Sequence, residues 1–176
     1  MRNLTTILLS LLLFNFTNLY SQITLEATDS FNGAGGGDDY CNDIVTDASG
    51  NIYSCGISTD GITSYAILVK YNASGQRIWQ KTYREVDNGK DNFYSLALDG
   101  NGNVYAAGNS WDSLTNNNFI VAKYDPDGNL IWRSIYNGAS NNNDALTKII
   151  VDNSGNLYAI GNTMNGAGTD FTLLKY

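Results

Sequence analysis

Between residues 92 and 136 the chain alternates between apolar segments and short polar runs. Four segments have the composition of strands, and they cover roughly 92–98, 103–109, 118–124 and 129–136. The runs between them are rich in Gly, Asn, Asp and Ser, which favour turns. No window sustains the 3.6-residue period of an amphipathic helix. The pattern therefore predicts an all-β protein whose consecutive strands are joined by tight turns.

The third and fourth segments predict different degrees of burial. Residues 118–124 contain the continuous apolar run Phe119-Ile-Val-Ala. Such a run is typical of a strand that is covered on both faces of its sheet. Residues 129–136 alternate instead, with Trp132 on one of the two faces. We expect this sheet to lie between two others, with the tryptophan packing against the following one.

The same pattern occurs three times in the sequence. The segment from Asp47 to Gly56 matches 99–108 after 52 residues, and that segment matches 152–161 after 53 more. Repeats of this length and strand content indicate blades of a β-propeller. The structural repeat positions are Asp47, Gly50, Tyr53, Gly56, Lys70, Tyr71, Trp79, Asp99, Gly102, Tyr105, Gly108, Lys123, Tyr124, Trp132, Asp152, Gly155, Tyr158 and Gly161.

These repeats divide the chain into an array of about three four-stranded antiparallel blades. Their approximate bounds are 39–90, 91–143 and 144–176, and the third lacks a fourth strand. Residues 23–30 have the register of a fourth strand and precede the first blade. Because propellers usually have at least four blades, we expect an incomplete ring. Three explanations remain open: a piece of a longer chain, self-association into a larger ring, or a monomeric arc.

The sequence predicts the geometry of the turn between the first two strands of each blade. Asp99 begins a type I turn by accepting backbone N–H groups, and Gly102 takes a left-handed conformation that closes the hairpin with a bulge. Gly50 and Gly155 stand at the same position in the other two blades.

The repeat resembles the bacterial beta-propeller repeat called SBBP. The resemblance rests on Asp-x-x-Gly-Asn-x-Tyr-x-x-Gly followed by Phe-x-x-x-Lys-Tyr-Asp-x-x-Gly-x-x-x-Trp, and it covers about residues 39–176. It implies an extracellular or cell-surface bacterial protein with seven-bladed architecture and no established catalytic activity. The number of repeats here departs from a full ring.

The first 21 residues have the features of a secretory signal peptide. Arg2 precedes an apolar segment centred on residues 8–13, and Ser21 offers a small residue for cleavage before Gln22. We therefore expect residues 22–176 to form the repeat region of a secreted or cell-surface protein.

Composition narrows the possible chemistry. The chain has net charge −7 and contains no histidine. The acidity disfavours nucleic acid as a partner, and the lack of histidine excludes Ser-His-Asp and Cys-His catalysis. Cys41 and Cys55 occupy apolar positions of the repeat on adjacent expected strands. Two buried thiols are the favoured interpretation, and a disulfide is the alternative.

Several repeated polar residues suggest structural roles. The loops that begin at Asp99, Asp125 and Asp152 resemble parts of calcium loops but offer too few oxygens, so turns are favoured over bound calcium. Three aspartates at the entry to each blade are expected to cap backbone N–H groups between blades, or alternatively to line a cation-binding pore: Asp39, Asp91 and Asp144. Three lysines are expected to lay their stems over neighbouring aromatic rings: Lys70, Lys123 and Lys175.

The residues that break the repeat are the better candidates for binding. Trp111 and Asp112 are expected on an exposed loop between the second and third strands of the middle blade, where they could contact a ligand. The asparagine runs 116–118 and 141–143 also lack counterparts. The sequence offers no catalytic or cofactor-binding residues.

The favoured function is a non-catalytic extracellular binding or scaffold module that contacts protein or polysaccharide through its blade loops. The alternative is a fragment of a propeller enzyme of the quinoprotein-dehydrogenase type, because the Asp-x-x-Gly-x-x-x-Trp turn is similar to repeats of those enzymes. Such an enzyme would need cofactor ligands in the channel of a full ring.

Overall fold

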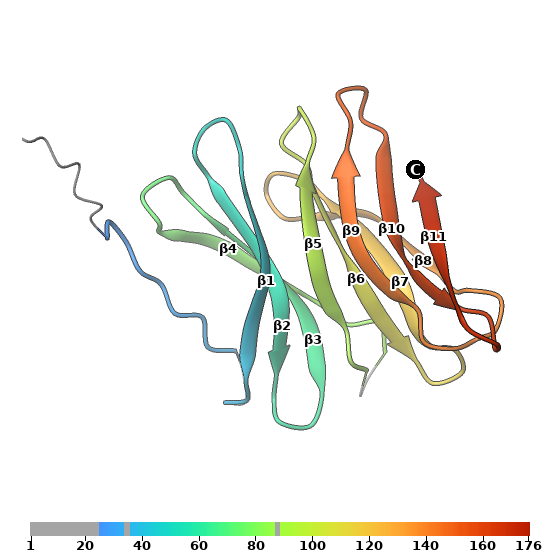
Figure 1. The fold of residues 1–176 in the computed structure, drawn as a ribbon. Coiled ribbons are helices and arrows are strands. Elements are labelled where there is room, and N and C mark those ends of the chain that lie inside the picture. The colour runs from blue at the N-terminus through green and yellow to red at the C-terminus, as the bar shows by residue number, and fades with distance from the viewer. Residues whose placement is uncertain (1–24, 34–35, 87–88) are drawn as a thin grey trace, which may run out of the picture.

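The described part of the chain forms three antiparallel sheets that stand side by side (Figure 1). The computed structural model describes residues 25–33, 36–86 and 89–176. Within these residues there is no helix, and accordingly none that could cross a membrane. The all-β prediction is therefore confirmed.

Each sheet corresponds to one repeat. The first blade is the sheet β1–β2–β3–β4, the second is β5–β6–β7–β8, and the third is β9–β10–β11. The strands are β1 (Asp39–Thr46), β2 (Ile52–Thr59), β3 (Ser64–Tyr71), β4 (Arg77–Tyr83), β5 (Asn92–Leu98), β6 (Val104–Asp112), β7 (Asn116–Tyr124), β8 (Leu130–Tyr136), β9 (Ala145–Val151), β10 (Leu157–Met164) and β11 (Thr169–Lys175). Consecutive strands pair throughout, so the result is an open array of propeller-type blades.

The segment before the first blade differs from the prediction. Residues 25–33 form no strand, although 23–30 were expected to be one. A strand needs an adjacent edge to pair with, and this segment lies across the face of the first blade instead. The expected signal peptide, residues 1–21, lies outside the described residues.

The turns have the expected geometry. The backbone N–H groups of Asn101 and Asn103 donate to Oδ1 of Asp99 over 2.9 and 3.0 Å. Gly102 has φ +79° and donates its N–H to the carbonyl of Asp99. Gly50 and Gly155 have φ +79° and +83°. The turn between the first and second strands is thus built in the same way in all three blades.

Gly102→Val should destabilise the protein by more than about 1 kcal/mol, because a β-branched residue at this φ is strained. The nearest atom that a Cβ would meet is 3.6 Å away, so the cost comes from the backbone and not from a clash. Gly100→Val is the matched control, since this neighbouring glycine has ordinary φ and open space around it. Equal urea midpoints for the two variants would contradict the turn assignment.

The hydrophobic core lies between blades. Each blade has a forward face toward the next blade in the chain and a rear face toward the previous one. The first core joins the forward face of blade one to the rear face of blade two: Tyr53, Cys55, Ala66, Leu68 and Tyr83 against Phe93, Leu96, Val104, Ala106, Ile120, Ala122 and Tyr124. The second joins blade two to blade three: Ala97, Tyr105, Ala107, Phe119 and Val121 against Leu146, Ile149, Leu157 and Ala159.

Blade two is therefore covered on both faces, as the continuous run in β7 predicted. Phe119 and Ile120 point to opposite faces and both are fully buried. Trp79 and Trp132, the tryptophans of the fourth strands, each pack against the following blade. The indole of Trp79 donates to the carbonyl of Pro126 over 3.2 Å, and the ring of Trp132 stacks on Tyr176. Together these contacts fix the position of each blade against the next.

Candidate functional site

The inner strands β1, β5 and β9 each carry a bulge at the same point of the repeat. The pairing register slips between Cys41 and Asp43, between Phe93 and Ser95, and at the corresponding point of β9. The extra residues are Asn42, Tyr94 and Thr147. A bulge turns the side chain of its extra residue out of the regular pleat. The backbone feature is repeated, but the three side chains differ.

A cleft lies beside the bulge of the middle blade, where β5 begins, β6 ends and β7 begins. It has a volume of about 450 Å³. Its lining residues come from blades one and two and from the connections that follow them: Ile57, Ser64, Lys90, Asn92, Tyr94, Asn109, Trp111, Asn116, Asn117 and Asn143. We refer to it as the asparagine cleft. The loop between β2 and β3 lies on the same side of the molecule, the lower side in Figure 1.

Trp111 lines this cleft, but not as an exposed loop residue. It belongs to β6, which extends to Asp112, and its side chain is half-buried. The loop expected there is only residues 113–115, because Trp111 and Asp112 pair with Asn117 and Asn116 of β7. Asp112 does not line the cleft; its carboxylate accepts the N–H of Leu114 over 2.8 Å.

The asparagines of the cleft are held by hydrogen bonds to one another or to the backbone. The amide oxygen of Asn109 accepts the N–H of Leu146 over 3.1 Å, and that of Asn92 accepts a bond from Asn42 over 2.8 Å. Asn117 donates to the amide oxygen of Asn143 over 3.1 Å. Each of these bonds uses one end of an amide group. The side chains are thereby oriented before any ligand arrives.

The chemistry of the cleft is polar and aromatic. Tyr94 is 39% exposed, and Trp111 provides a second partly exposed ring. Lys90 is the one charged residue in the lining. Amide groups donate and accept hydrogen bonds in fixed directions, and aromatic rings offer flat apolar surfaces. This combination suits a neutral, hydroxyl-rich ligand.

Behind the cleft, Asp91 is completely buried and joins two segments of backbone. Its Oδ2 accepts the N–H of Glu85 over 2.9 Å, and its Oδ1 accepts the N–H of Trp111 over 3.1 Å. Burial is the largest influence on its pKa and raises it, against the lowering effect of these hydrogen bonds. Asp91 thus ties the connection between blades one and two to the strand that carries Trp111.

Asp144 of blade three forms the same two-sided clasp, whereas Asp39 of blade one forms one side of it, because its Oδ1 has no hydrogen-bond partner among the described residues. Asp144 accepts the N–H of Gly138 over 2.6 Å and that of Met164 over 3.2 Å. Asp39 accepts the N–H of Gly33 over 2.8 Å. The structure therefore places these aspartates on backbone N–H groups at the blade connections.

The carboxylate oxygens of the turn aspartates likewise accept hydrogen bonds from groups of the protein. Asp152 accepts the N–H groups of Ser154 and Asn156 through Oδ1, and the side chains of Asn156 and Tyr158 through Oδ2. The bonds from Asn156 are the main reason that the pKa of Asp152 is lowered. In the described residues, no three acidic, cysteine or histidine side chains converge as metal ligands. These loops are turns in the structure.

The repeated lysines lie over tyrosine rings of the neighbouring strand. The Nζ atoms of Lys70, Lys123 and Lys175 stand 5.1, 4.7 and 5.4 Å from the ring centroids of Tyr53, Tyr105 and Tyr158. Lys123 also forms an ion pair with Asp99 over 3.2 Å. Cation–π contacts of this kind join the second and third strands of every blade.

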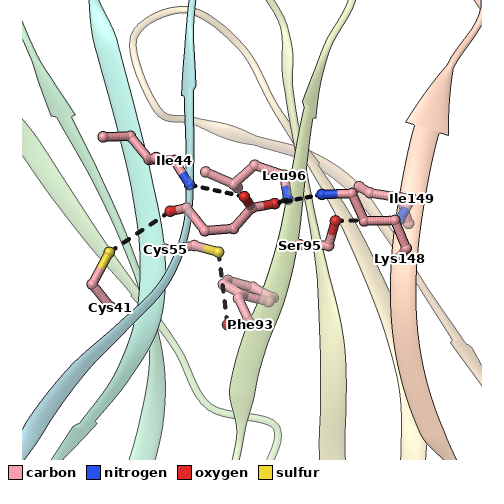
Figure 2. Close-up of polar contacts among 9 residues, drawn as sticks. Cys41, Ile44, Cys55, Phe93, Ser95, Leu96, Lys148 and Ile149 are labelled. Atoms are coloured by element: carbon pink, nitrogen blue, oxygen red, sulfur yellow. Dashed lines mark hydrogen bonds and ion pairs between the residues drawn. The ribbon is translucent and has the colours of Figure 1, made fainter.

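A polar network connects the three inner strands (Figure 2). The carboxylate of Asp43 accepts hydrogen bonds from the N–H groups of Ile44 and Leu96, each over 2.9 Å. It also forms an ion pair with Lys148 over 3.0 Å. One blade further along, Ser95 accepts the N–H of Ile149 over 3.2 Å. The network holds the bulged strands beside the cleft in a fixed order.

Both cysteines are free thiols, and only one is buried. Cys55 lies in the first core, where burial raises the pKa of its thiol. Cys41 is exposed, which corrects the expectation of two buried thiols. Its position corresponds to Phe93 and Leu146, which face a preceding blade. Cys41 lines the rear face of blade one, where the described chain places no blade.

Residues 82–119, from the end of β4 into β7, match the family model of the beta-propeller repeat SBBP. This segment is therefore similar to one SBBP beta-propeller repeat. The matched SBBP segment contains Asp91, Tyr94, Asn109 and Trp111, so the cleft is built largely on it. No curated protein matches the chain.

Sequence reasoning found part of the cleft and missed the rest. It singled out Trp111 and the two asparagine runs, and the structure brings Trp111, Asn116, Asn117 and Asn143 together. It missed Tyr94, Asn92 and Asn109. The signal that could have found Tyr94 is the mismatch with Asn42 and Thr147 at one repeat position.

Proposed function

We propose that this chain is a non-catalytic extracellular binding module that holds a neutral polysaccharide in the asparagine cleft. The observation that carries the proposal is the convergence of two partly exposed aromatic rings with five oriented asparagines in one cleft. Sugar rings stack their apolar faces on aromatic side chains, while amides match their hydroxyl groups. The volume of about 450 Å³ lies in the range of small-ligand sites.

Two further observations support the choice of ligand and location. The net charge of −7 disfavours acidic polymers, which leaves a neutral chain as the better match. The pattern of residues 1–21 supports export to the compartment where polysaccharides are met. A repeated SBBP scaffold with one non-repeating cleft also fits recognition through a site placed on a structural framework.

The test is a calorimetric titration of the purified protein with soluble glucans, mannans and galactans. We expect at least one of them to bind, and Trp111→Ala to weaken binding at least about tenfold, the loss of one stacked ring. Met164→Ala is the matched control, because Met164 has the same repeat position in blade three but lies outside the cleft.

Failure of every polysaccharide to bind, or equal affinity of the two variants, would contradict the proposal. A visible-range cofactor absorption in the purified protein would contradict its non-catalytic part and favour the quinoprotein alternative.

A further inference from the structure

Residues 25–31, which precede blade one, lie where the fourth strand of a preceding blade would lie, but they belong to no sheet among the described residues. A Cβ on Gly75 would meet Ala27, just as a Cβ on Gly128 would meet Trp79. Ala27 and Trp79 are separated by one repeat, as are Gly75 and Gly128. Residues 25–31 therefore stand against blade one where β4 stands against blade two.

One further contact repeats this correspondence, and contacts of Arg77 also hold the segment on blade one. Arg77 lies over the ring of Phe31 at 5.5 Å. Gly33 donates to Asp39 as Glu85 donates to Asp91. An ion pair between Arg77 and Asp29 over 2.6 Å also holds the segment in place. Yet the segment pairs with no strand among the described residues.

Blade three has the opposite feature: it is a sheet of three strands with no fourth strand among the described residues. Among the described residues, no strand pairs with the outer edge of β11. The forward face of blade three is also uncovered: Phe171 is 72% exposed and Leu173 is 57% exposed, whereas their counterparts in blade two, Phe119 and Val121, are fully buried. A groove of about 260 Å³ lies on this face, lined by Ile150, Tyr158, Ile160 and Leu173 among others.

The rear face of blade one is the complementary surface. A groove of about 340 Å³ on it is lined by Ile44, Ile52, Ser54, Ile67, Val69 and Tyr71 among others. In blade two the same repeat positions are Leu96, Val104, Ala106, Ile120, Ala122 and Tyr124, which form the rear half of the first core. The chain thus carries both halves of an interface that it already forms twice internally.

We propose that a second copy of this chain docks head to tail, with the rear face of its blade one on the forward face of blade three. The docked copy brings residues 25–31 alongside β11 as the missing fourth strand. The pairing of β7 with β8, carried over by the repeat, sets the register: Phe31 faces Phe171, Asp29 faces Leu173, and Ala27 faces Lys175. The first of these pairs reproduces the contact of Phe119 with Tyr136 at 5.9 Å.

A closed dimer is the assembly that this contact favours. The interface is heterologous, so it forms a ring if the rotation closes. Two copies contribute six blades, which lies within the four to eight of typical propellers, whereas three copies would contribute nine. Closure would also remove the exposed edge of β11.

Light scattering on a sizing column tests the assembly directly. We expect twice the mass of one chain for the wild type and the mass of one chain for Phe171→Asp, which places a charge at the centre of the interface. Leu114→Asp is the control, because Leu114 is an exposed residue away from both faces, and it should remain dimeric. A single-chain mass for the wild type at micromolar concentration, or a dimer unaffected by Phe171→Asp, would overturn the proposal.

A disulfide trap tests the register. In a Cys41→Ser background, the pair Ser30→Cys and Thr172→Cys should form a covalent dimer on mild oxidation, because the two residues face each other in the expected pairing. The pair Ser30→Cys and Ser154→Cys is the control, since Ser154 lies in an exposed turn away from β11. Equal cross-linking of both pairs would contradict the strand exchange even if a dimer exists. Neither result bears on polysaccharide binding.

Discussion

Replacing Gly108 by alanine should destabilise the protein by roughly 3 kcal/mol, the upper end of the cost of overpacking. A Cβ at this position would stand 1.9 Å from the carbonyl oxygen of Asn92 and 2.8 Å from Cα of Phe93. Both atoms belong to the backbone of β5 beside its bulge, so no side chain can move aside. The bulge, and with it the placement of Tyr94, depends on this close approach.

The measurement is urea unfolding followed by circular dichroism. Gly100→Ala is the matched control because a Cβ there meets nothing within 4 Å, and it should unfold within about 0.5 kcal/mol of the wild type. Gly56 stands at the same repeat position as Gly108 and would meet the carbonyl oxygen of Tyr40. Wild-type stability of Gly108→Ala would show that β5 and β6 do not approach each other as described.

Asp91→Asn should destabilise the protein by about 2–4 kcal/mol. The buried carboxylate accepts two backbone N–H groups, one on each oxygen. An amide can accept only one of them and turns its own NH₂ group toward the other, which leaves buried donors without an acceptor. Asp127→Asn is the control, since Asp127 is exposed. Equal unfolding free energies for the two variants would rule out the clasp.

The pH dependence of this loss has a defined sign. Burial raises the pKa of Asp91 in the folded state. The stability of the wild type is therefore highest below the unfolded pKa of about 3.9 and falls as the pH rises through the raised folded value, whereas Asp91→Asn has no titrating group at this position. The difference between wild type and Asp91→Asn should be larger at pH 4 than at pH 7. The opposite trend would mean that the carboxylate is not desolvated.

The repeat explains how much of the fold could be predicted from the sequence. Asp99 and Gly102 define a turn through local chemistry alone, and the apolar run beginning at Phe119 defines a strand covered on both faces. Trp79 and Trp132 recur with the spacing of a blade and pack against the next one. These features depend on residues close in the chain or related by the repeat period, so pattern alone reveals them.

Features that depend on a missing neighbour were not predictable in this way. Cys41 occupies a core position of the repeat but is exposed, because no described blade covers the rear face of blade one. Residues 23–30 have the register of a strand, but their described part, 25–30, pairs with no edge among the described residues. In both cases the local pattern predicts a covered residue or a paired strand, and the described residues do not include the tertiary partner.

The candidate site was only partly visible for a different reason. Trp111 was assigned to a loop because its neighbours are polar, yet pairing with Asn117 extends β6 through it. Tyr94 reaches the cleft through a bulge, which shows in the sequence only as a mismatch at one repeat position. Asn92 and Asn109 join the cleft through contacts between strands, which only the structure brings together.

The most direct test of the proposed function is the nuclear magnetic resonance spectrum of the three indole N–H groups during polysaccharide titration. The chain has three tryptophans, so each gives one signal, and Trp111→Phe identifies that of Trp111. We predict that the Trp111 signal shifts on binding, while those of Trp79 and Trp132, which lie at contacts between blades, stay in place. A stationary Trp111 signal with saturating polysaccharide, or a shift confined to Trp79 or Trp132, would contradict binding in the asparagine cleft.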